Sequence, residues 1–113
     1  MGEETILCAA SAYEKKFYLN PDFASLPEQI KEELQIMCVL FTEDVGGLLM
    51  VVYDEDGNLE LKVDHNSDDF FFDEIGSVLK IKELQATKVE LFESLELYYK
   101  VFYLGEKLDV TGD

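Results

Sequence analysis

The stretch that most constrains the fold is the last third of the chain, from Ser67 to Leu104. Only Gly76 interrupts it, and its apolar residues recur at the three- and four-residue steps of an α-helix. These apolar positions are Ile75, Leu79, Leu84, Leu91, Leu95, Tyr98 and Phe102. The spacing predicts one long C-terminal helix over about 68–104, followed by a frayed tail over 105–113.

The length of this predicted helix raises a difficulty. A single helix over 68–104 would measure roughly 55 Å at about 1.5 Å per residue, which exceeds the width of a compact domain of 113 residues. We therefore expect either a break, near Gly76-Ser77 or near Ala86-Thr87, or a projecting end. A projecting end would expose apolar side chains that one domain cannot cover, which makes it a candidate interaction surface. That surface consists of Leu91, Leu95, Tyr98, Tyr99 and Phe102.

The residues before this stretch predict two β-hairpins. Thr5–Ser11 is short and uncharged, and Phe17–Leu19 follows a charged segment, so we place the first turn at residues 12–15. The apolar run Leu48–Tyr53 and the alternating run Leu59–Asp64 form the second hairpin, with the turn between them. We expect the continuous run to be buried on both faces, and the alternating run to lie partly toward solvent or at an edge.

A helix lies between the two hairpins. Ser25 and Glu28 have the spacing of a capping box, so the helix is expected to begin near Leu26. Gly46-Gly47 ends it. Its second half, Ile36–Phe41, is apolar on all sides and is predicted to be the most buried helical segment.

The segment that precedes the long C-terminal stretch allows two interpretations. Ser67 can cap a helix whose first turn holds Asp68 and Asp69, where negative charge suits the helix dipole. Alternatively, Asp69–Asp73, with three phenylalanines at its centre, forms a short fifth strand paired with Leu59–Asp64. The helix start is preferred. Either way the sequence predicts a single α+β domain in β-β-α-β-β-(β)-α order, whose antiparallel sheet of four or five strands packs against a central and a C-terminal helix.

The charge of the chain restricts its partners. Twenty-five acidic residues face nine basic residues, all of them lysine, and the formal net charge is −16. Such a surface repels phosphate backbones and anionic lipids, so we expect neither nucleic acid nor membrane as a partner and favour a basic protein. The sequence contains no run of 18 apolar residues and no signal-peptide pattern, which predicts a cytoplasmic location.

No motif points to a catalytic, cofactor or metal site, and none is predicted. The segment Asp54–Asn58 copies the opening of a calcium-binding EF-hand loop, but Leu59 stands where that loop needs glycine and His65 where it needs glutamate. His65 is the only histidine, so an ordinary zinc site is not expected. Cys8 and Cys38 lack the spacing of a redox or metal motif and are predicted to be buried thiols.

Four segments carry a resemblance to known proteins: Leu26–Leu34, Phe41–Gly47, Asp73–Ser77 and Leu95–Lys100. They resemble a family of small acidic bacterial proteins known only as a domain of unknown function, and the resemblance covers about Leu7 to Gly105. This resemblance implies no activity, cofactor or site residue. The order of elements is also similar, more weakly, to roadblock and longin domains, which share a profilin-like sheet and mostly serve as dimeric scaffolds or regulators of small GTPases and motors. The chain departs from roadblock domains in lacking their N-terminal helix.

The function expected from these features is that of a small acidic adaptor or regulatory module without enzymatic activity, acting as a homodimer through its C-terminal helix. Two alternatives stay open. One is a ligand-binding or enzymatic domain with a pocket between sheet and helices. The other is an acidic mimic of nucleic acid that occupies a basic protein.

Overall fold

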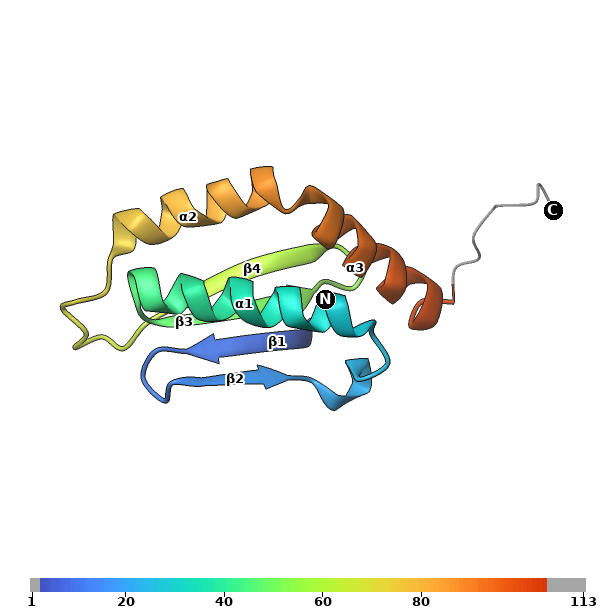
Figure 1. Ribbon diagram of the computed structural model, residues 1–113, viewed down its shortest axis with the longest axis horizontal. Coiled ribbons are helices and arrows are strands. Elements are labelled where there is room, and N and C mark those ends of the chain that lie inside the picture. Colours follow the sequence, from blue (N-terminus) through green and yellow to red (C-terminus); the bar gives the residue numbers. More distant parts are fainter. Residues whose placement is uncertain (1–2, 106–113) are drawn as a thin grey trace.

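A four-stranded antiparallel sheet packed against α-helices forms the core of the computed structural model, which describes residues 3–105 (Figure 1). The strands are β1 (Thr5–Ser11), β2 (Lys16–Leu19), β3 (Leu48–Tyr53) and β4 (Leu59–Asp64), in the order β2-β1-β3-β4. The helices are α1 (Glu28–Val45), α2 (Glu74–Thr87) and α3 (Val89–Phe102), and a short 3-10 turn, η1 (Pro21–Phe23), precedes α1. The predicted α+β class with four strands is confirmed. Apart from Gly105, the predicted frayed tail lies outside the described residues.

Both predicted hairpins are confirmed. β1 pairs with β2 and β3 pairs with β4, each in antiparallel register. In the second turn, the Asp54 carboxylate accepts the backbone N–H groups of Asp56 and Asn58, each at 2.9 Å, and the hydrogen bonds from Asn58 contribute most to a lowered Asp54 pKa. Gly57 takes a φ of +86°, which a side chain would disfavour. As expected, β3 is central and largely buried, and β4 lies at an edge.

The register of the strands sorts their side chains onto two faces. Ala10 on β1 is opposite Leu49 on β3, which is opposite Val63 on β4, and all three belong to or pack against the core. The intervening row, with Ala9 and Met50, points to the other face. Figure 1 shows α1 lying over the sheet and running nearly along the strands, with α2 and α3 beside it along the β4 side.

Helix α1 begins two residues later than predicted. Pro27 is its N-cap and makes no side-chain hydrogen bond, so the predicted capping box is not formed. The Ser25 hydroxyl instead bonds the hydroxyl of Tyr98 on α3. The predicted burial of Ile36–Phe41 holds for Met37, Cys38 and Phe41. Ile36 and Leu40 differ from that expectation, because they are exposed beside α2.

The predicted single C-terminal helix is wrong, and the alternative of a break near Ala86-Thr87 is confirmed. Lys88 separates α2 from α3, and its backbone leaves the helical region with φ −111° and ψ 29°. One cause lies just before it: the Thr87 hydroxyl donates to the Glu83 carbonyl at 2.8 Å, a back-bond that favours bending. The result is two helices of 14 residues, each about 21 Å long, which removes the problem of length.

Neither interpretation of the triple phenylalanine is correct. Residues 70–72 form neither the first turn of a helix nor a strand. Helix α2 begins at Glu74, and the Asp73 side chain caps it by accepting the backbone N–H of Gly76 at 2.8 Å. The Asp73 backbone N–H donates to the Val45 carbonyl at 3.0 Å. This hydrogen bond holds the start of α2 against the end of α1, so the phenylalanines that precede Asp73 lie outside both α2 and the sheet.

A cluster of aromatic rings joins α3 to the sheet. Tyr53 on β3 is fully buried and donates its hydroxyl to the Leu95 carbonyl at 2.8 Å. Its ring stacks on Tyr99 with centroids 4.2 Å apart, and on Phe23 at 5.7 Å. Burial of the hydroxyl is the largest cause that raises the pKa of Tyr53 above its ordinary value, and the nearby negative charge of Glu96 adds to it.

This burial predicts a loss of stability in alkali. An unfolded tyrosine ionises near pH 10, whereas the raised pKa of Tyr53 keeps the folded form neutral. Above about pH 10 the unfolded state then binds fewer protons than the folded state, so the contribution of Tyr53 to stability is complete below about pH 10 and falls by up to about 1.4 kcal/mol per pH unit above it. Urea unfolding at stepped pH measures this fall. The Tyr53→Phe variant should show a shallower fall, and an identical slope in both proteins would contradict the assignment.

Candidate functional site

Residues 65–73, called here the phenylalanine loop, connect β4 to α2 and hold two adjacent aromatic rings in solvent. Phe70 is 90% exposed and Phe71 is 98% exposed. Single apolar residues on a surface are ordinary, but two neighbouring large rings left almost wholly in water are not. The loop is therefore the first candidate for a functional surface.

The third phenylalanine anchors the loop. The Phe72 ring stacks on His65 with centroids 4.4 Å apart, and it also lies against Gly47, which follows α1. A Cβ atom at Gly47 would come within 2.8 Å of the Phe72 ring and 2.6 Å of the Asp64 carbonyl oxygen. The close approach of the loop to the α1–β3 junction thus requires glycine at position 47.

Hydrogen bonds fix the other half of the loop. The Tyr13 hydroxyl, from the first hairpin, donates to the Asp69 carboxylate at 2.5 Å and accepts the Asn66 backbone N–H at 3.0 Å. The same carboxylate accepts the Phe71 backbone N–H at 3.0 Å. The bond from Tyr13 is the largest cause of a lowered Asp69 pKa, so the carboxylate stays charged. The two exposed rings are thus presented by an organised turn.

The surroundings of the exposed rings are negative. The sequence from Asp64 to Leu79 contains five carboxylates and no lysine. These acids are Asp64, Asp68, Asp69, Asp73 and Glu74. An apolar tip with carboxylates around it is complementary to an apolar pocket with a basic rim.

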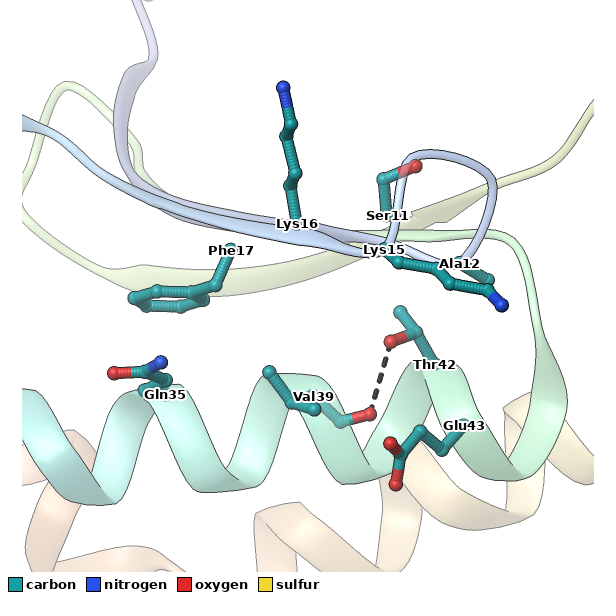
Figure 2. Close-up of a pocket in the computed structure, with 9 residues that line it drawn as sticks. All are labelled: Ser11, Ala12, Lys15, Lys16, Phe17, Gln35, Val39, Thr42 and Glu43. Atoms are coloured by element: carbon teal, nitrogen blue, oxygen red, sulfur yellow. Dashed lines mark hydrogen bonds between the residues drawn. The ribbon is translucent and has the colours of Figure 1, made fainter.

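A cleft between α1 and the first hairpin is the second candidate (Figure 2). Its volume is about 570 Å³. The lining residues are Ser11, Ala12, Lys15, Lys16, Phe17, Gln35, Val39, Thr42 and Glu43. Figure 2 shows the Phe17 ring facing α1, and Lys15 at the same end of the cleft as Thr42 and Glu43.

Few polar side chains of the cleft point into it with free hydrogen-bonding groups. The Lys16 side chain points away from α1 in Figure 2. The Thr42 hydroxyl already donates to the Val39 carbonyl at 3.1 Å. Lys15, Gln35 and Glu43 remain, and they could hold a small molecule with an apolar body and charged ends. The cleft lining contains no cysteine or histidine that could act as a nucleophile or base beside them.

The two cysteines meet in the core, although they are 30 residues apart. The Cys8 sulfur on β1 lies 3.9 Å from the Cys38 sulfur on α1, and both residues are free thiols with no exposed surface. Their predicted burial is confirmed. The hydrogen bond with Cys38, together with burial, raises the pKa of the Cys8 thiol and keeps it protonated. A protonated, buried thiol is a poor nucleophile.

The five residues predicted as an interaction surface divide into two groups. Leu91, Leu95 and Tyr99 are buried in the core of the chain, so in this fold they are not available to a partner. Tyr98 is partly buried against the same core, and Phe102 is mostly exposed. The two most exposed apolar side chains are Phe70 and Phe71 on the phenylalanine loop. Further exposed apolar side chains lie on all three helices, and those on α2 are Ile75, Val78 and Leu79.

Sequence reasoning missed the phenylalanine loop because an apolar triplet looks like core. One signal could have located it. Asp73-Glu74 is a better helix start than Ser67, because an aspartate cap is followed directly by an acidic first turn. That start would have put the triplet ahead of the helix. Within residues 3–105, no three metal-binding side chains converge. No helix in the same range is long and apolar enough to span a bilayer.

Taken together, the fold and the loop define a small acidic α+β domain that presents an anchored apolar turn. The chain belongs to a family whose function is not known: the model described as "Family of unknown function (DUF6145)" matches residues 4–107. The predicted membership in an uncharacterised family is thereby confirmed. Neither the search of curated proteins nor the search of solved structures gave a match. Bacterial origin and the likeness to roadblock and longin domains stay predictions.

Proposed function

We propose that this protein is a non-enzymatic adaptor or regulatory module that binds a basic protein partner through the phenylalanine loop. The observation that carries the proposal is the exposure of Phe70 and Phe71, 90% and 98%, on a turn anchored by Phe72 and Tyr13. Burying one such ring contributes about 1.5–3 kcal/mol. Because the turn is already organised, a partner that covers the rings loses little of this gain to ordering the loop.

Charge selects the kind of partner. With a net charge of −16 and five carboxylates near the rings, the loop repels acidic proteins and attracts basic ones. Such attraction raises the association rate and weakens with salt. We infer a cytoplasmic location for this interaction from the sequence features described above.

The test is capture of a partner from an extract of the native host, followed by binding of that purified partner. The bait is the full chain with a photo-crosslinking phenylalanine analogue at position 71. A double variant, Phe70→Ser with Phe71→Ser, removes the rings. A matched control, Leu97→Ser, removes an exposed apolar side chain from α3. Neither change touches the buried core, so urea unfolding should be nearly unchanged in both.

We expect one basic protein to cross-link to the bait and to bind the unmodified chain and the control equally. Its affinity for the double variant should be at least about tenfold lower, a loss of about 1.4 kcal/mol. Raising the ionic strength to about 0.5 M should also weaken binding. Equal affinity for the double variant and the control would refute the role of the loop, and an acidic partner would refute the electrostatic argument.

A further inference from the structure

Helix α2 has an apolar side that nothing in the described chain covers. Its inward side carries Ser77 and Leu84, which are buried. On the opposite side, Ile75 is 76% exposed and Leu79 is 61% exposed, with Val78 about half exposed beside them. These three residues are called here the outer face of α2. A helix of a monomeric domain usually places charged residues on the side away from the core.

The outer face continues along the helix with a regular spacing. Ile75, Leu79, Lys82 and Ala86 follow one another at steps of four, three and four residues, and all four are exposed. This is the spacing of the contact line between two packed helices. Ala86 at one end is small enough for a second helix to approach closely, and the stem of Lys82 can lie along an apolar neighbour.

The charge of α2 distinguishes it from the other helices. Its 14 residues contain two glutamates and two lysines, so its net charge is zero. By the same count, α1 has five acids and one lysine, a net of −4, and α3 has three acids and one lysine, a net of −2. Two chains that each carry −16 therefore repel each other least where their α2 helices meet.

The order of charges along α2 is also self-complementary. Glu74 lies in the first turn of α2, and Lys82 lies two turns further on with no ion pair among residues 3–105. When two such helices pack in opposite directions, the acidic start of each meets the lysine of the other. A basic partner would find no excess of negative charge on this face, which favours a second copy as its occupant.

We propose that two copies of this chain form a symmetric dimer by packing the outer faces of their α2 helices antiparallel. The two Leu79 side chains meet near the two-fold axis, and Lys82 of each chain pairs with Glu74 of the partner subunit, so the ion pair forms twice. The contact is limited to one helix of about 21 Å per chain, so it buries less surface area than a standard protein–protein interface. We therefore expect a dissociation constant in the micromolar range. Phe70 and Phe71 precede α2 and do not belong to its outer face.

The test uses charge exchange on the full chain, with sedimentation equilibrium from about 1 μM to 1 mM. The wild-type chain should dimerise. Lys82→Glu places two acids against each other at the interface, and Glu74→Lys places two lysines there, so each variant should dimerise at least about tenfold more weakly. Mixing these two variants should restore a dimer, because each then supplies the charge that the other lacks. The control Glu93→Lys, on the exposed side of α3, makes the same charge change as Glu74→Lys and should leave dimerisation unchanged.

Three results would overturn the proposal. The first is a wild-type chain that stays monomeric at the highest concentration. The second is a dimer that Leu79→Ser and both charge variants leave intact, which would place the contact elsewhere. The third is a mixture of the two charge variants that stays monomeric. Circular dichroism and urea unfolding of each variant exclude misfolding as the cause. The loop variant Phe70→Ser with Phe71→Ser should dimerise normally, so failure of partner binding and failure of dimerisation are distinguishable.

Discussion

Replacing Phe23 by alanine is expected to destabilise the fold by about 3–5 kcal/mol, a large part of the roughly 5–15 kcal/mol that holds a domain folded. Phe23 belongs to the short turn η1 and has no exposed surface. Its ring centroid lies 4.9 Å from that of Tyr103 and 5.7 Å from that of Tyr53. The substitution leaves a cavity between the sheet and α3, and the surrounding rings are held by strands and helices that cannot collapse into it.

Urea unfolding followed by circular dichroism measures this loss, and Phe102→Ala is the matched control. Phe102 is also a phenylalanine at the α3 end of the molecule, but it is mostly exposed and pairs with one ring, Tyr98, at 4.7 Å. We expect Phe102→Ala to cost less than about 1 kcal/mol, because little of its surface is removed from water. Equal destabilisation by the two substitutions would show that Phe23 does not hold α3 to the sheet.

Gly47→Ala should have the second large effect, a loss of about 2–4 kcal/mol. The φ of Gly47 is +72°, a conformation that costs a side chain about 1–2 kcal/mol. In addition, the new Cβ atom would lie 2.6 Å from the Asp64 carbonyl oxygen, which belongs to backbone and cannot rotate away. The Phe72 ring, 2.8 Å from the same atom, would have to move. The substitution should therefore release the phenylalanine loop as well as lower stability.

The control Gly105→Ala separates the cost of the positive φ from the cost of the close approach to Asp64 and Phe72. Gly105 has the same φ of +72°, but nothing lies within 4 Å of the place where its Cβ would stand. Gly105→Ala should therefore lower the free energy of unfolding by no more than the cost of a positive φ, about 1–2 kcal/mol. Hydrogen exchange of the Asn66 and Phe71 amides reports the loop directly and should accelerate only in Gly47→Ala. If both variants lose the same stability and keep the same exchange, the close approach at Gly47 is not important for the fold.

The elements that the sequence predicts correctly are those whose cause is local. The second hairpin follows from strand periodicity and from a turn that contains Gly57, and both lie within one short segment. The end of α1 at Gly46 is local in the same way. The break between α2 and α3 was anticipated from helix length, although its position at Lys88 depends on backbone geometry that composition does not reveal.

The elements that the sequence does not reveal depend on contacts between distant residues. The spacing of Leu91, Leu95 and Tyr99 identifies an apolar stripe, but it does not tell whether the chain's own sheet or a second molecule covers it. The phenylalanine loop depends on Tyr13, 53 residues before Asn66, and on the absence of a side chain at Gly47, where the Phe72 ring packs. Periodicity carries no information about such pairs.

The hydrogen bond between Thr5 and Tyr99 has a consequence for how the chain folds. It joins the hydroxyl groups of two residues 94 positions apart, at 3.2 Å, so the first strand and the last helix close the core together. Contacts of such long range slow folding. On the ribosome, β1 and η1 emerge long before α3, and until then Phe23 and Tyr53 lack the helix that covers them. We therefore expect the nascent chain to be a client of chaperones until Tyr99 has emerged.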